Sequence, residues 1–237
     1  MTVEIDIDFD MRDDTPGTKD PDAASPTLRR YHAALWSKPL PDGTLFALNA
    51  SDENCYLRHT STLGDFHLSS DSIIHTYRRD GMRGVLSHFA AEEIAAFVRV
   101  AFTIGGYIVF PGNRVGGRQT INQARGTNRR IDDRFDLTLE CIRRYYSGED
   151  SPLAQTLALY PEFFALFGNF SGYCEFFLLQ DLLTEDGGVR FLLEFDEFGH
   201  VPLPTSAAQY ASYRDAAMAF VEARNQRIQR FAISRQS

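Results

Sequence analysis

A glycine-spaced loop rich in arginine carries the strongest chemical signal in this sequence. Between residues 112 and 126, Arg114, Arg118 and Arg125 offer forked N–H donors, and Asn122 adds a neutral donor. The glycines of this loop allow the backbone to approach a ligand closely or to adopt a positive φ. Such donors suit a phosphate or a carboxylate. We therefore predict that these four residues bind an anionic ligand.

The loop matches no established phosphate-binding motif. It contains neither the GxxxxGK[ST] of a P-loop nor the GxGxxG of a dinucleotide-binding site, so the signal is one of composition. The structural alternative is a long surface loop whose arginines pair with acidic residues elsewhere in the chain. Long loops in compact domains are often functional, so both interpretations stay open.

Two acidic residues follow the loop at helical spacing. Asp136 and Glu140 would share one face of a helix, where they could supply a general base or bind a hard metal ion beside a phosphate. We take them as candidate catalytic residues. The structural alternative is the stronger one, because acidic residues at a helix start complement its dipole and Glu140 is well spaced to pair with Arg144.

The remaining reactive residue types form no recognisable site. Asp6, Asp8 and Asp10 alternate on an expected strand and could bind a cation, although a solvated strand face explains them more simply. The six histidines have no HxH, HxxxH or HExxH spacing, and no GxSxG occurs. The three cysteines form no CxxC pair, which argues against a zinc site and a disulfide framework. The sequence therefore identifies no metal and no cofactor.

Charge is distributed unevenly along the 237 residues, whose formal net charge is −8. The first 22 residues are strongly acidic, whereas residues 112–144 hold eight arginines against four acidic residues. The acidic total makes a duplex-DNA-binding protein improbable. No run of about 18 apolar residues occurs, so we expect no membrane span. The acidic N-terminus lacks the basic start of a secretory signal, so we expect a cytoplasmic protein.

Hydrophobic periodicity predicts a helix-dominated α+β fold, with one domain over residues 1–237 and a small, partly antiparallel sheet. Residues 1–24 should form an acidic strand, at 3–10, and a polar turn. Helices are expected at 26–36, 91–103, 131–146, on both sides of Pro161, at 170–183 and from Thr205 or Ser206 onwards. Short strands are expected at 45–49, 55–60, 72–78, 107–110 and 189–195. The apolar segment 170–183 should lie at the centre of the core.

Two stretches resemble an uncharacterised bacterial family of unknown function. They are SPTLRRYHAALWSKPLP at 25–41 and INQARGTNRRIDDRFDLTLECIRRYY at 121–146, and the resemblance extends through FFALFGNFSGY. It implies no activity. From the residues, we expect a ligand-binding protein or an enzyme acting on a phosphate-bearing small molecule, a nucleotide or a nucleic-acid end. The alternative is a protein–protein interaction module without catalytic activity.

Overall fold

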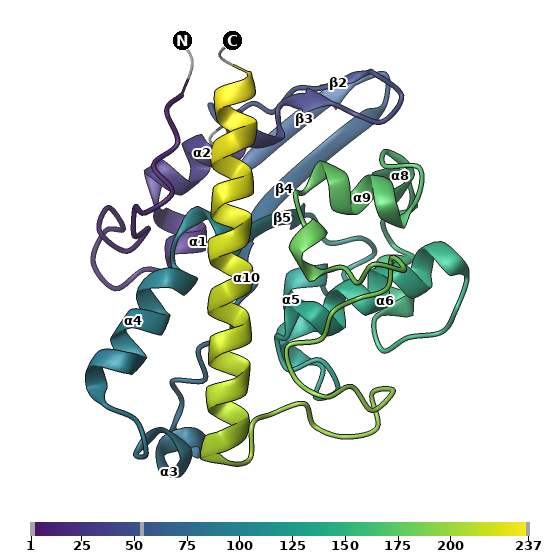
Figure 1. Ribbon diagram of the computed structural model, residues 1–237. Coiled ribbons are helices and arrows are strands. Elements are labelled where there is room, and N and C mark those ends of the chain that lie inside the picture. Colours follow the sequence, from purple (N-terminus) through teal and green to yellow (C-terminus); the bar gives the residue numbers. More distant parts are fainter. Residues whose placement is uncertain (1–2, 53–54, 236–237) are drawn as a thin grey trace.

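The fold is organised around a three-stranded antiparallel sheet, seen in a computed structural model that describes residues 3–52 and 55–235 (Figure 1). The strands are β3 (Leu57–Ser61), β4 (Gly64–Ser72) and β5 (Tyr107–Pro111), with β4 in the middle. Leu57 pairs with Leu68, and Ser72 pairs with Tyr107. β4 therefore extends beyond β3 along one edge, and α1 (Pro21–Ala24) packs against it. A second small sheet joins β1 (Lys38–Pro39) to β2 (Leu45–Phe46).

Helices account for most of the remaining regular structure. After α1 they are α2 (Pro26–Trp36), α3 (Arg83–Leu86), α4 (Ala91–Ala101), α5 (Ile121–Thr127), α6 (Phe135–Ser147), α7 (Ala154–Leu157), α8 (Pro161–Ala165), α9 (Phe170–Phe176) and α10 (Ala207–Ser234). Short 3-10 helices occur at Asp80–Met82, Ile104–Gly106 and Gln180–Leu182. The predicted α+β class is confirmed, with antiparallel pairing in both sheets. Among the described residues, no helix is long and apolar enough to cross a membrane.

The long C-terminal helix α10 spans the molecule and separates its two sides. Figure 1 shows α4 on one side of α10 and α5, α6, α8 and α9 on the other. At its centre, Arg224 is fully buried and donates hydrogen bonds to the carbonyl oxygens of Gly105 and Tyr107, both at 2.8 Å, and of Phe177 at 3.0 Å. These carbonyl groups would otherwise be buried without a donor, so Arg224 ties α10 to the sheet and to the segment after α9.

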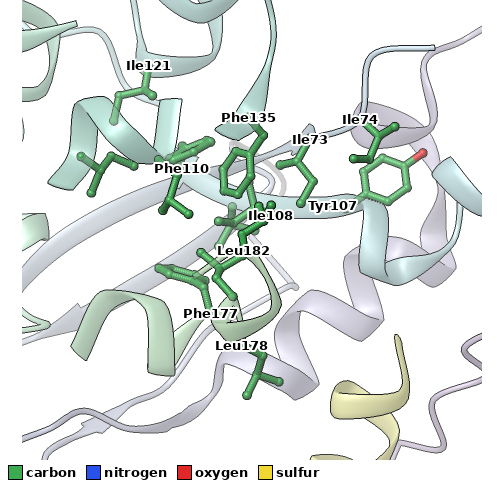
Figure 2. Packing of buried hydrophobic residues seen from close by; sticks show 14 of the residues in the cluster. Ile73, Ile74, Tyr107, Ile108, Phe110, Ile121, Phe135, Phe177, Leu178 and Leu182 are labelled. Carbon is green, nitrogen blue, oxygen red and sulfur yellow. The ribbon is translucent and has the colours of Figure 1, made fainter. Parts of the chain in front are cut away.

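Aromatic and aliphatic side chains pack around β5 to form the core. Ile108 and Phe110 are fully buried, and Figure 2 shows them together with Phe135, Phe177 and Leu182. The prediction that residues 170–183 lie at the centre of the core is confirmed by this burial. The prediction of one continuous helix there is wrong, because α9 ends at Phe176 and a 3-10 helix follows, with Leu178 between them at φ 55°.

The predicted strand at residues 3–10 is also wrong over the described residues 3–10. Its amides bond to side chains instead of to a neighbouring strand: Asp6 donates to the Tyr31 hydroxyl at 2.9 Å, and Asp8 donates to the Asp6 carboxylate at 3.0 Å. Asp10 is buried and pairs with Arg12. The three aspartates therefore do not form a row on one strand face.

The strand predictions at 72–78 and 189–195 are also wrong, because the backbone of both segments is mostly irregular. β4 ends at Ser72, so the segment 73–78 continues as irregular backbone, with Tyr77 at φ 54°. At 189–195 an isolated bridge joins Leu183 and Val189, and the Arg190 amide donates to the carbonyl of Leu182 at 2.8 Å. The helix starts are confirmed where the caps are local: Ser25 caps α2 and Ser206 caps α10.

Candidate functional site

The predicted anion-binding loop places Arg114 and Arg118 on the surface. Both side chains are exposed, and neither has a hydrogen-bond or ion-pair partner among the described residues. Gly116 and Gly117 adopt φ values of 56° and 74°, as expected for a loop built on permissive glycines. The pockets described below are lined by other residues. These two arginines are therefore available to an anionic partner but lie outside those pockets.

Arg125, by contrast, points into the interior and is fully buried. Its guanidinium forms an ion pair with Asp71, donates to the Thr138 hydroxyl at 2.9 Å and donates to the carbonyl of Asp133 at 2.9 Å. It thereby connects β4, α5 and α6. Since its donors are used within the protein, Arg125 is not available to an external ligand, and the predicted set does not converge on one site.

Asn122 also faces the sheet. Its amide nitrogen donates to the carbonyl of Ser70 at 3.0 Å and to the Ser69 hydroxyl at 3.2 Å, which attaches α5 to β4. Its amide oxygen is buried and has no partner within the described structure. Asn122 therefore lies with Arg125 on the inner side of α5, separate from Arg114 and Arg118.

The two candidate catalytic carboxylates have structural partners. Asp136 is fully buried, pairs with Arg134 and accepts the Leu192 amide at 2.8 Å. Glu140 accepts hydrogen bonds from Arg143 and from Arg144, at 2.8 Å and 2.7 Å. Burial alone would raise the pKa of Glu140, but these hydrogen bonds outweigh it and hold the pKa below its usual value. These contacts fit the structural alternative that the sequence offered.

A second carboxylate cluster, not singled out by the sequence, lies where α1 meets β4. Burial raises the pKa of Asp22 to about 8, with Asp20 and Asp71 adding repulsion, and burial raises the pKa of Asp71 to about 6 despite its ion pair with Arg125. The Tyr107 hydroxyl is buried and has no partner within the described structure. Figure 2 shows the Tyr107 ring beside Ile74. In the described part of the chain, no cluster of His, Cys, Asp and Glu side chains has a metal-binding arrangement. The cluster is therefore a set of carboxylates, Asp22 and Asp71, whose pKa values are raised by burial.

One pocket is lined by acidic, basic and aromatic side chains and has a volume of about 660 Å³. We call it the α10 groove. It lies between the turn before α6, the loop at 193–205 and the first turns of α10. Its lining residues are Arg130, Arg134, Leu137, Leu193, Glu194, Phe195, Asp196, Phe198, His200, Val201, Pro202, Leu203, Thr205, Ala208, Gln209 and Ser212. Figure 1 shows the loop as the yellow-green segment that leads into α10. This volume lies in the range of small-molecule sites.

Positive charge and unpaired donors meet in the α10 groove. The Arg130 guanidinium is exposed, with no side-chain partner among the described residues. α10 has no acidic residue in its first turn, and the amides of Ala207 and Ala208 have no acceptor within the helix. Thr205, Ala208 and Gln209, at the start of this helix, line the groove. The exposed carboxylates of Glu194 and Asp196 are the opposing charges among the lining residues.

His200 and Asp196 form a hydrogen-bonded pair on the groove wall. The His200 Nδ1 contacts the Asp196 carboxylate, and this hydrogen bond lowers the pKa of Asp196. A tight turn brings the two together, with Glu197 and Phe198 at φ values of 58° and 62°. The contact uses Nδ1, so Nε2 remains available to a ligand. Sequence reasoning missed this pair, because a four-residue spacing is informative in a helix and this segment is irregular.

Comparison with known proteins identifies a family but no activity. No curated protein and no solved structure matches this chain. The model of a family of unknown function, DUF6994, matches residues 5–228, which include both stretches that carried the resemblance. The chain therefore belongs to the family of unknown function DUF6994.

Proposed function

We propose that this protein binds a phosphate-bearing small molecule, such as a nucleotide, in the α10 groove. The observation that carries this proposal is the presence in one pocket of Arg130, His200 and the positive end of a 28-residue helix. The ligand class is the one that the arginine-rich loop at residues 112–126 suggested. The residues differ, since Arg114 and Arg118 lie elsewhere and Arg125 is buried.

The phosphate would lie between Arg130 and the start of α10. A guanidinium donates two parallel hydrogen bonds to phosphate oxygens, and free amides at a helix start bind anions through both hydrogen bonding and the helix dipole. Ser206 already caps the Gln209 amide at 3.2 Å, so the amides of Ala207 and Ala208 are the ones left for a ligand. Protonated His200, which lines the same groove, would add a further hydrogen-bond donor.

The apolar part of the ligand would contact the aromatic wall of the groove. Phe195 stacks on Phe191 with a ring-centroid distance of 4.1 Å, and Phe198 packs against Phe195 at 4.9 Å. The Arg144 guanidinium lies 5.0 Å from the centre of the Phe198 ring and makes a cation–π contact with it. Val201 adjoins this wall and is 53% exposed. A planar base or another apolar group would cover this surface.

His200 also gives the groove an imidazole, a side chain that can act as a general acid or base. In a reaction, its Nε2 would exchange the proton with the ligand, while Asp196 would hold the ring in position through Nδ1. Proton transfer coupled to the making or breaking of a phosphate ester is the reaction class that this arrangement favours.

A second function rests on the exposed loop. Arg114 and Arg118 have no partner among the described residues and lie outside the pockets described above. Unpaired guanidinium groups on an open surface suit an acidic protein partner better than a small ligand. Loss of such a partner on replacement of both arginines, with ligand binding unchanged, would support this docking role alongside the groove.

The proposed function can be tested by thermal shift at low salt with ATP, GTP, pyrophosphate and phosphate. A ligand at 100 times its Kd stabilises the native state by about 2.7 kcal/mol, which should raise the Tm by about 5 °C or more. The double variant Arg130→Ala, His200→Ala should lose this shift, and the matched control Arg114→Ala, Arg118→Ala should keep it. Equal shifts in both variants, or no shift with any of these ligands, would refute the groove as the site.

A further inference from the structure

Lys38, in β1, is a buried amine that lacks a counter-charge. The residue is 6% exposed, and its ammonium has no hydrogen-bond acceptor or ion-pair partner among the described residues. Its Nζ lies 5.2 Å from the ring centre of Trp36, 4.7 Å from that of Phe176 and 4.4 Å from that of Phe231. The ring faces offset part of the cost of burying the charge, but they accept no proton. When the amine is neutral, its lone pair is therefore unengaged.

This amine is accessible from a pocket, which we call the Lys38 pocket. The pocket has a volume of about 340 Å³ and lies between β1, α9 and the C-terminal end of α10. Leu40, Pro41, Phe176 and Phe231 give it apolar walls. Such a space can hold a small molecule of a few carbon atoms beside Lys38.

Three charged groups surround the amine. Arg235 and Glu175 line the same pocket, and Arg224 lies beneath it in α10. Burial, followed by repulsion from Arg235 and Arg224, lowers the pKa of Lys38 to about 7. Arg235 is held in place by hydrogen bonds to the carbonyl oxygens of Ala34 at 3.1 Å and Ser37 at 2.9 Å. The pocket thus combines a nucleophile, a fixed cation and a carboxylate.

We propose that Lys38 forms an imine with a small oxo acid bound in this pocket. The neutral nitrogen attacks the carbonyl carbon, a C–N bond forms, and the carbonyl electron pair moves to the oxygen, which takes up a proton. The resulting carbinolamine loses its hydroxyl as water and the nitrogen loses a proton, which gives the imine. Glu175 can supply and recover these protons, and Arg235 can pair with the carboxylate of the oxo acid.

The chain itself provides a matched control, because Lys19 and Lys38 are its two lysines. Lys19 is exposed, in the polar segment before α1. At pH 7 about half of the Lys38 amine would be neutral, given its pKa of about 7. An ordinary lysine, with a pKa of about 10.4, is neutral in fewer than about one molecule in a thousand at this pH. The difference predicts selective reaction at Lys38 without any substitution.

The test is to incubate the full chain with glyoxylate and cyanoborohydride at pH 7 and to map the reduced adducts by peptide mass spectrometry. We expect labelling of Lys38 to exceed labelling of Lys19 by about tenfold or more. Raising the pH from 6 to 8 should increase the Lys38 rate several-fold. Equal labelling of the two lysines, or labelling of Lys19 alone in the folded protein, would overturn the proposal.

A variant tests the choice of an oxo acid. Arg235→Gln removes a repulsion that lowers the pKa of Lys38, so labelling by formaldehyde, which has no carboxylate, should fall and report that effect alone. Labelling by glyoxylate should fall about fivefold or more beyond the formaldehyde effect, because the carboxylate also loses its partner. Circular dichroism of this variant would establish that it is folded. Parallel changes with both reagents would show that Arg235 does not bind the carboxylate and would contradict the oxo-acid assignment.

Discussion

Five of the eight arginines between residues 112 and 144 form two groups that their local sequence does not separate. Arg125 and Arg134 are buried, and each pairs with a carboxylate and further acceptors inside the protein. Arg114, Arg118 and Arg130 are exposed, and their side chains have no partner among the described residues. A ligand can bind only where guanidinium N–H donors are not already used within the protein. The density of arginine along the chain therefore does not identify a binding site.

Within the exposed group, the surroundings make the further distinction. Arg130 lines the α10 groove together with His200 and the start of a long helix. Arg114 and Arg118 project from the glycine loop without a cavity described beside them. We therefore propose small-ligand binding for Arg130 and surface docking for the loop, and the following predictions test this division.

The largest effect is expected for Arg125→Ala. The change leaves Asp71 largely buried without its counter-charge and removes the hydrogen bond to Thr138, so stability should fall by about 3–5 kcal/mol. Urea unfolding followed by circular dichroism measures the loss. A midpoint equal to that of the parent would show that Arg125 is not structurally essential and would remove the basis of the comparison.

A smaller loss is expected for Asp136→Asn. The amide can still accept hydrogen bonds, but Arg134 would be buried without a negative partner, so stability should fall by about 2–3 kcal/mol. Thermal unfolding at neutral pH provides the measurement. Unchanged stability would return Asp136 to the list of candidate catalytic residues, since its carboxylate would then have no structural role.

The carboxylate cluster beside α1 should make stability depend on pH. The pKa of Asp22 is raised from 3.8 to about 8, so between about pH 4 and pH 8 the folded protein holds a proton that the unfolded chain releases. Stability should therefore fall as the pH rises through this window.

Asp22→Asn removes this titration. The variant should be more stable than the parent by about 1 kcal/mol or more at pH 8, with little difference at pH 4. Parallel thermal melts at the two pH values compare the proteins, and Asp8→Asn, at an exposed position, serves as the control. The same difference at both pH values would mean that Asp22 does not titrate in this window.

The smallest effect on stability is expected for the double variant Arg114→Ala, Arg118→Ala. Because both side chains are exposed and unpaired among the described residues, stability should change by less than about 0.5 kcal/mol. Its thermal unfolding can be compared directly with that of Arg125→Ala. A loss similar to that of Arg125→Ala would show that the two groups of arginines do not differ.

Local sequence predicted those parts of the fold that local interactions determine. Ser25 followed by Pro26 starts α2, and Ser206 starts α10, because a capping hydroxyl satisfies amides within the same few residues. The segment 107–110 was predicted as a strand from its unbroken apolar run, and β5 confirms it. Burial of the segment 170–183 was equally evident from its composition.

The features that the sequence did not predict depend on distant residues. Residues 173–183 contain no Gly or Pro, yet the helix ends at Phe176. The carbonyl of the next residue, Phe177, accepts a hydrogen bond from Arg224 of α10. Arg125 and Arg118 both lie in the glycine-spaced loop sequence at 112–126. Arg125 is buried and pairs with Asp71, which is 54 residues away, whereas Arg118 is exposed. The groove likewise joins Arg130 to His200 across the fold.

The central claim is tested most directly by the affinity for ATP, measured by isothermal titration calorimetry at low salt. We compare the parent with Arg130→Ala and Arg118→Ala, which replace two exposed arginines of the arginine-rich range 112–144. A hydrogen-bonded charge contributes about 1.5–3 kcal/mol, so Arg130→Ala should raise the Kd about tenfold or more, and Arg118→Ala should leave it within about twofold. Loss of binding in Arg118→Ala with Arg130→Ala unaffected would contradict the groove and assign the ligand to the glycine loop.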